Sequence, residues 1–223
     1  MPTDARRVLV LWAVDHTLIE NCGVSKENYR LAFELLTGRS ASLPPRTDGR
    51  TDLAILADLF TDHGEDVTRY SRDRQWNALV EAGIGTRDAL AQRGYALPGA
   101  LACLKWLAED PSMIQSVLTG NIEPNARVKL GAFGLDRWLD FSVGGFGFDA
   151  PDRFELIRIA QTRAQHAYGF DPVSDVTVTI GDTRLDVEAA RQGGARVIAV
   201  ATGITPIEEL RDAGADVALP DLA

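Results

Sequence analysis

The hydrophobic residues of this chain fall into short runs that are separated by helical patterns. Most runs are rich in Val, Ile and Leu without strict alternation, which is typical of strands buried on both faces. This pattern predicts strands at residues 8–12, 114–118, 141–143, 176–180, 197–200 and 217–219. Helical patterns lie between them at residues 99–109, 126–133, 154–167, 186–191 and 206–213. Such alternation predicts an α/β fold with a doubly wound parallel, Rossmann-like sheet.

The segment from residue 19 to residue 97 breaks this rhythm. It carries helical patterns at residues 26–36, 52–60 and 67–82 and no convincing strand. A segment of this length is too long for a single crossover between parallel strands. We therefore predict a helical cap domain at residues 19–97, inserted into a core domain formed by residues 1–18 and 98–223.

The composition and charge of the chain argue against some classes of function. The chain has 223 residues, of which 45% are hydrophobic, and a net charge of −9. An acidic chain without a Lys/Arg-rich run is unsuited to bind nucleic acid or an anionic membrane. Cys22 and Cys103 lack metal-ligand spacing, and no signal sequence or membrane-length apolar run is present. We expect a cytoplasmic protein, and the sequence indicates no particular oligomeric state.

Polar residues follow the predicted strands at the edge where an open parallel sheet binds ligands. Asp15 follows the first strand and could act as a general acid and base, or simply form an Asx turn. Thr119, Gly120 and Asn121 follow the second strand. Their hydroxyl, amide and backbone N–H groups would suit a phosphate group, although Asn121 could instead cap the next helix.

Charged residues complete this set. Lys129 or Arg153 could provide the fixed positive charge that a phosphoryl site needs, although an isolated Lys or Arg is more often a surface residue. Asp182 and Asp186 straddle a predicted strand-to-helix turn. Two carboxylates there suit Mg²⁺, and the alternative is that they cap the helix and favour its dipole.

Three stretches of sequence together resemble the haloacid dehalogenase-like hydrolases, in particular the phosphoglycolate phosphatase-like branch with its helical cap. They are residues 8–18 (VLVLWAVDHTL), the motif Gly181-Asp182-Thr183-x-x-Asp186 and residues 193–200 (GGARVIAV). The resemblance extends over nearly the whole chain. It implies the same fold, a Mg²⁺ cofactor and a small phosphorylated metabolite as substrate.

The resemblance also implies roles for individual residues. Asp15 would be the general acid and base, and Thr119 would hold the transferring phosphoryl group, with Gly120 and Asn121 beside it. Lys129 or Arg153 would be the site cation. Mg²⁺ would be bound by Asp182 with the support of Asp186 and the backbone carbonyl of Asp15. His16 would lie beside the phosphate group, and Arg50, in a predicted cap loop, would contact the substrate.

Ala13 occupies the position at which the resemblance implies the nucleophilic aspartate. Our leading hypothesis is a Mg²⁺-dependent phosphatase that is inactivated because alanine has replaced this aspartate, as in a variant made to trap a complex. The hypothesis is motivated by the presence of every other expected site residue. The alternative is a natural non-catalytic protein that binds a phosphorylated ligand or a protein partner. A third interpretation is slow hydrolysis by water, with Asp15 as the base.

Overall fold

Six parallel strands form the central sheet of the computed structural model, which describes residues 6–223. Their order across the sheet is β5-β4-β1-β6-β7-β8. The chain therefore winds outward in both directions from β1, and the predicted doubly wound sheet is confirmed. The strands are β1 (Val8–Trp12), β4 (Met113–Thr119), β5 (Gly145–Phe146), β6 (Val176–Gly181), β7 (Arg196–Val200) and β8 (Val217–Leu219).

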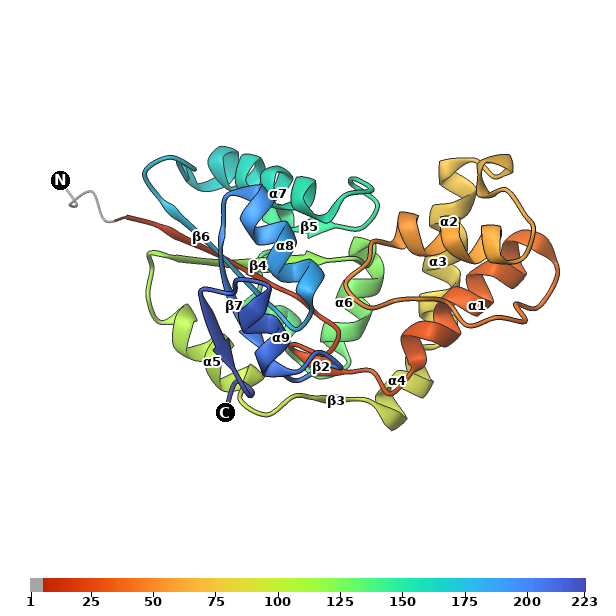
Figure 1. Cartoon of the computed structure of the whole chain (residues 1–223), viewed down its shortest axis with the longest axis horizontal. Helices are drawn as coiled ribbons and strands as arrows, with labels where there is room; N and C mark the ends of the chain where they lie inside the picture. Colours follow the sequence, from red (N-terminus) through yellow and green to blue (C-terminus); the bar gives the residue numbers. More distant parts are fainter. Residues whose placement is uncertain (1–5) are drawn as a thin grey trace.

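Helices cover both faces of this sheet, as Figure 1 shows. On β1, Leu9 and Leu11 contribute to an apolar cluster with α7 (Arg153–Tyr168), whereas Val10 and Trp12 contribute to a second cluster with α5 (Ala100–Ala108) and α6 (Glu123–Gly131). This two-sided burial explains why the strand is a continuous apolar run. The remaining core helices, α8 (Arg184–Gly193) and α9 (Ile207–Asp212), pack with β7 in a smaller cluster.

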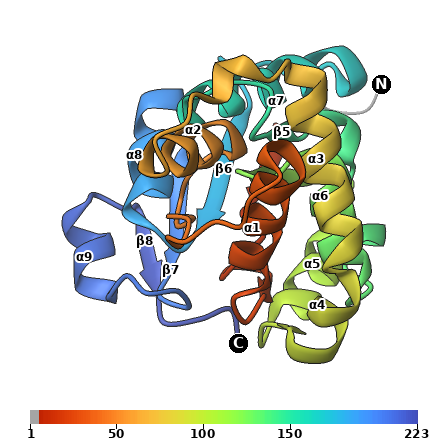
Figure 2. The same ribbon diagram turned by 90° about the vertical axis from the view of Figure 1, so that its right-hand side faces the viewer.

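A group of helices, the helical lobe (residues 24–93), lies beyond one end of the sheet (Figures 1 and 2). Its helices are α1 (Val24–Thr37), α2 (Asp52–Asp62), the short 3₁₀ helix η1 (Val67–Arg69), α3 (Arg72–Gly85) and α4 (Arg87–Arg93). The helices α1, α2, η1 and α3 share an apolar cluster that is separate from those of the sheet, in which Phe33, Phe60 and Leu79 are fully buried. The lobe thus has its own packing and is not one more layer on the sheet.

Two short strands join the lobe to the core and correct the expectation that residues 19–97 contain no strand. β2 (Ile19–Glu20) and β3 (Tyr95–Ala96) pair in antiparallel fashion, with Ile19 opposite Ala96. Each strand has only two residues, so neither leaves a pattern of hydrophobicity that could be detected in the sequence.

The strand predicted at residues 141–143 was wrong. This segment is the 3₁₀ helix η3 (Phe141–Val143), and the edge strand β5 follows it. Asp140 explains the turn, because its carboxylate accepts hydrogen bonds from the backbone N–H and the hydroxyl of Ser142 at 2.9 and 2.7 Å. Phe141 and Val143 are buried in the core, but they reach it from a turn.

Smaller differences concern the helices. The pattern at residues 67–82 corresponds to η1 and α3, which are separated by a break at Tyr70 and Ser71, and Ser71 caps α3. α4 was not predicted, and the 3₁₀ helix η2 (Asp136–Trp138) follows α6. Within the described residues, no helix combines the length and the apolar character needed to cross a bilayer.

Candidate functional site

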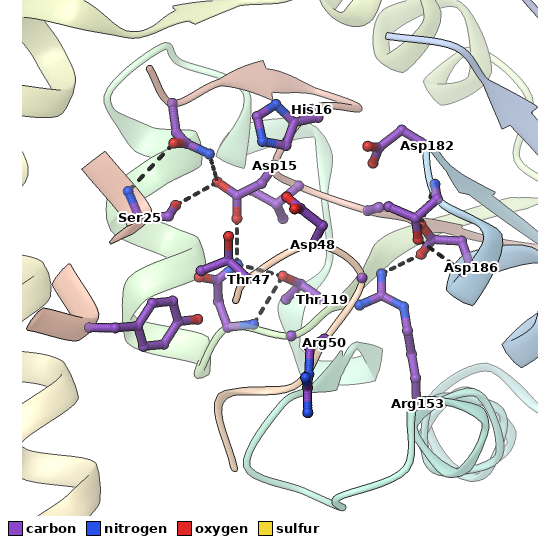
Figure 3. A pocket seen from close by; sticks show the side chains of 18 residues that line it. Asp15, His16, Ser25, Thr47, Asp48, Arg50, Thr119, Arg153, Asp182 and Asp186 are labelled. Carbon is purple, nitrogen blue, oxygen red and sulfur yellow. Dashed lines mark hydrogen bonds and ion pairs between the residues drawn. The ribbon is translucent and has the colours of Figure 1, made fainter. Parts of the chain in front are cut away.

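A small pocket of about 50 Å³ opens where the carboxyl ends of β1, β4 and β6 face the helical lobe (Figure 3). A volume of this size holds on the order of a few water molecules. Most of the predicted site residues line it, from three different strand ends and from the lobe. The lining residues are Ala13, Val14, Asp15, His16, Asn21, Ser25, Tyr29, Thr47, Asp48, Gly49, Arg50, Thr119, Gly120, Asn121, Arg153, Asp182, Thr183 and Asp186.

Asp15 is the centre of a hydrogen-bonded network at one side of the pocket. Lys129 lies behind it, and its Nζ is 2.9 and 2.7 Å from the two carboxylate oxygens. Asn21 and Ser25 donate to Oδ1 at 2.8 and 3.1 Å, and Asn121 donates to Oδ2 at 2.9 Å. Burial raises the pKa of Asp15, but the charge and hydrogen bonds of Lys129 and the hydrogen bond of Asn121 outweigh it and lower the pKa to about 2. The carboxylate is therefore ionised in the ligand-free protein.

The turn after β4 is held tightly against the lobe. The hydroxyl oxygen of Thr119 accepts hydrogen bonds from the backbone N–H and the side-chain amide of Asn121, at 3.2 and 2.7 Å. The carbonyl of Gly120 accepts from the backbone N–H of Asp52 at 2.7 Å. A Cβ at Gly120 would lie only 1.8 Å from the carbonyl oxygen of Arg50, so this close approach requires glycine.

Two buried acids form the opposite side of the pocket. Asp186 accepts hydrogen bonds from the backbone and hydroxyl of Thr183 in a capping box at the start of α8, and it pairs with Arg153 at 2.5 Å. Asp182 accepts a hydrogen bond from Thr17 at 3.1 Å. Burial and the neighbouring charge of Asp186 raise the pKa of Asp182 to about 7. Arg153 thus pairs with Asp186, whereas Asp182 has no ion pair among the described residues.

The two candidate cations lie at opposite sides of the pocket. Lys129 binds Asp15, whereas Arg153 binds Asp186 and lines the pocket itself. The Nε atom of Arg153 is buried and has no hydrogen-bond partner among residues 6–223. A ligand oxygen could satisfy this donor.

The predicted metal ligands are not gathered into one cluster. Across residues 6–223, no three His, Cys, Asp or Glu side chains lie close enough together to hold a metal ion. Both carboxylate oxygens of Asp15 bond to Lys129, and those of Asp186 bond to Arg153 and Thr183. Asp182 remains, a buried carboxylate that is short of positive charge, and its hard oxygen atoms are of the type that Mg²⁺ prefers.

The remaining predicted residues are at or near the pocket. Ala13 is 5% exposed, and its methyl group is the only side-chain atom that residue 13 offers there. His16 has a left-handed backbone (φ 58°), and its Nδ1 lies 2.8 Å from Glu20. Arg50 lines the pocket, but its guanidinium pairs with Asp58 at 2.6 Å and points away from the centre in Figure 3.

Several lining residues were not predicted. Asn21, Ser25, Tyr29, Thr47 and Asp48 come from the lobe or from the segment that leads into it. The sequence placed Arg50 in a predicted cap loop, but no periodic pattern indicated which side chains beside Arg50 would face the core.

Comparisons with known proteins place this site in a family. The model of the family described as "HAD: haloacid dehalogenase-like hydrolase" matches residues 10–191. No curated protein sequence matches the chain.

Solved structures share the whole fold at low sequence identity. A hydrolase from Pseudomonas syringae is 20% identical with a TM-score of 0.68, and the match covers 97% of this chain and 94% of that one. A predicted phosphoglycolate phosphatase from Haemophilus somnus 129pt is 17% identical with a TM-score of 0.66, over 96% and 94% of the two chains. CbbY from Rhodobacter sphaeroides, solved in complex with phosphate, is 19% identical with a TM-score of 0.63, over 98% and 95%.

Proposed function

Because the chain belongs to the haloacid dehalogenase-like hydrolases, we propose that its pocket is that of a Mg²⁺-dependent phosphatase of small phosphorylated metabolites, impaired by Ala13. One observation carries the proposal. Asp15, Thr119 and Asp182 come from three separate strand ends and meet at one pocket around Ala13. Two of the similar structures, a predicted phosphoglycolate phosphatase and CbbY in complex with phosphate, support a phosphate ester as the substrate.

The core side of the pocket supplies the groups for the phosphoryl group. The hydroxyl of Thr119 and the backbone N–H groups of the turn after it would hold the phosphoryl oxygens, and Arg153 would offset their charge. Asp182 and the backbone carbonyl of Asp15 would hold Mg²⁺, with Asp186 in support. When bound, the metal would neutralise charge on the phosphoryl group.

Asp15 would protonate the oxygen of the departing leaving group as a general acid, and would later take a proton from the attacking water as a general base. Lys129 keeps it ionised in the ligand-free protein, with a pKa of about 2. A bound anionic ester would raise that pKa, since a nearby negative charge disfavours the ionised form of a carboxyl group. The proton exchange is thereby linked to substrate binding.

The helical lobe would act as a cap over this core. We assign residues 19–97 to the cap domain and residues 1–18 and 98–223 to the core domain. The lobe contributes Ser25, Tyr29 and the loop at residues 47–50 to the pocket, so closure would exclude water and bring the lobe to the substrate.

Ala13 removes the reacting group from this arrangement. In the proposed reaction a carboxylate attacks phosphorus and forms an aspartyl-phosphate, which water then hydrolyses. A methyl group can neither attack phosphorus nor bind a metal ion, so turnover would be lost. The remaining residues of the pocket would still bind the phosphate ester.

Ala13→Asp is the experiment that tests the proposal. Phosphate release is measured with a panel of phosphate esters and Mg²⁺ for the parent chain, Ala13→Asp and Ala13→Asn. Asparagine matches aspartate in shape but is not a nucleophile. We expect only Ala13→Asp to be active. Its rate of phosphate release should exceed that of the parent chain by at least about a thousandfold. A folded, inactive Ala13→Asp protein would instead favour a natural non-catalytic protein that binds a phosphorylated ligand or a protein partner. Equal slow activity in all three would favour water attack with Asp15 as the base.

A further inference from the structure

The loop of the helical lobe that faces the pocket presents an acid to it. Thr47 and Asp48 both line the pocket, and in Figure 3 Asp48 lies between Asp15 and Asp182. Within residues 6–223, no hydrogen bond or ion pair engages the carboxylate of Asp48. An ionised carboxylate that faces a pocket without a partner can accept hydrogen bonds from a ligand.

The cation of the same loop does not offset this charge. Arg50 pairs with Asp58 on α2 at 2.6 Å, and its side chain points away from Asp15 and Asp182. Asp58 also binds Arg46 at 3.2 Å, outside the pocket. The lobe therefore presents negative charge to the pocket, where the resemblance to phosphoglycolate phosphatases implied a positive one.

The position of this loop is fixed by contacts with the core. Gly49 has a left-handed backbone (φ 67°), and a Cβ there would lie 2.6 Å from the hydroxyl oxygen of Thr183. The hydroxyl of Thr51 donates to the carbonyl of Pro151 at 2.9 Å, and the backbone N–H of Asp52 donates to the carbonyl of Gly120 at 2.7 Å. Asp48 is thus held over the pocket by the contacts of the residues that directly follow it.

We propose that Asp48 determines specificity by selecting phosphate esters whose leaving group carries hydrogen-bond donors, either hydroxyl or ammonium groups. The same carboxylate repels a leaving group that carries its own carboxylate, such as that of phosphoglycolate. The inference rests on the proposed function, because the phosphoryl group must lie against Thr119 and Arg153 for the leaving group to face the lobe. Like-charge repulsion of this kind is a common means of rejecting a wrong ligand.

The absence of a nucleophile makes a binding test straightforward, since the esters would not be consumed. Isothermal titration calorimetry in Mg²⁺ buffer would use inorganic phosphate, glycerol 3-phosphate, phosphoethanolamine and phosphoglycolate as probes. We expect phosphoglycolate to bind more weakly than the two donor-bearing esters. Asp48→Asn should reduce the ratio between the dissociation constants of phosphoglycolate and of these two esters by about tenfold, equivalent to about 1.4 kcal/mol. If Asp48→Asn loses affinity only for phosphoethanolamine, the ammonium group is the preferred donor. If it loses affinity for glycerol 3-phosphate as well, hydroxyl groups are also recognised.

Asp73→Asn is the matched control, because it removes the same charge from an exposed residue at the start of α3. It should leave all affinity ratios unchanged. Phosphoglycolate binding as tightly as glycerol 3-phosphate, or an unchanged ratio in Asp48→Asn, would overturn the inference while leaving the phosphate site intact. Failure of all four probes to bind, including inorganic phosphate, would instead contradict the proposed function itself and the inference with it.

Discussion

The two sides of the pocket balance the charge of their acids differently. On one side, the partly buried carboxylate of Asp15 meets one ammonium group, Lys129, and three neutral donors. On the other side, Arg153 pairs with Asp186, whereas the buried Asp182 has no ion pair among residues 6–223. The pKa of Asp15 is consequently lowered to about 2, whereas burial and the neighbouring carboxylate raise that of Asp182 to about 7.

This difference separates a network whose charge is already balanced from a side of the pocket at which a cation can still bind. The network around Asp15 joins the lobe to the core, because Ser25 comes from α1 and Lys129 from α6, and it is complete without a ligand. The side that holds Asp182 still lacks positive charge. A cation would therefore bind most favourably on that side, since it would offset the free-energy cost of burying the charged form of Asp182.

The largest effect should follow from Lys129→Met, which removes the ammonium group that balances Asp15. The side chain of Lys129 is 6% exposed and that of Asp15 is 23% exposed, so the loss of Lys129 leaves a largely buried carboxylate without a counter-charge. We expect the free energy of unfolding to fall by about 3–5 kcal/mol at pH 7, measured by urea titration. Because the lowered pKa of Asp15 contributes stability above pH 4 and loses it as the pH falls toward 2, the deficit should shrink in acid.

Two controls make this prediction specific. Lys26→Met changes an exposed lysine on α1 and should have little effect on stability. Adding Asp15→Asn to Lys129→Met should recover part of the loss, because the uncompensated charge is then gone. If Lys129→Met lowered the free energy of unfolding by less than about 1 kcal/mol, the magnitude typical of surface ion pairs, the ion pair between Lys129 and Asp15 would not have the expected importance for stability.

Asp52 provides a second, slightly smaller test of the rule that burial without a cation raises a pKa. Its carboxylate accepts hydrogen bonds from the hydroxyl of Tyr29 and from the backbone N–H of Ile122, so it also joins the lobe to the core. Burial raises its pKa to about 6 in spite of these hydrogen bonds. Its contribution to stability is present below pH 4 and is lost as the pH rises through 6.

The measurement is the free energy of unfolding from pH 4 to pH 7. Asp52 should account for a decrease of roughly 2 kcal/mol over this range. Asp52→Asn should make the profile less steep without flattening it, because Asp182, whose pKa is raised to about 7, also loses its proton there. The exposed residue Asp73 serves as the control, since Asp73→Asn should leave the slope unchanged. An equal slope in Asp52→Asn and the parent chain would contradict the raised pKa of Asp52.

The sequence predicted the sheet well because its strands are buried on both faces and leave continuous apolar runs. The same signal misled at residues 141–143, where Phe141 and Val143 are buried from a 3₁₀ turn that Asp140 starts. The strands β2 and β3 could not have been found, since two residues form no pattern.

The core side of the pocket was also accessible from sequence, because parallel strands deliver the residues after them to one edge. Asp15, Thr119 and Asp182 all line the pocket for this reason. On the lobe side, only Arg50 was predicted from the sequence. Ser25 and Asp48 reach the pocket only because the lobe docks on the core, and such contacts between distant segments are not encoded in local spacing. The same holds for the division of the two cations between Asp15 and Asp186.

The smallest expected effect, and the one that most directly compares the two sides of the pocket, is that of Asp182→Asn. Without metal at pH 8, this variant should be more stable than the parent chain by about 1–2 kcal/mol, because it removes a buried carboxylate that lacks a counter-charge. Thr17 can still donate to the asparagine side chain. Asp186→Asn should do the opposite, since it weakens both the pair with Arg153 and the capping box of α8. Thermal unfolding with and without Mg²⁺ then separates the roles: Mg²⁺ should raise the melting temperature of the parent chain but not that of Asp182→Asn. If Asp182→Asn were destabilised without metal and stabilised by Mg²⁺ as much as the parent chain, the two sides of the pocket would not differ in the way that their charges indicate.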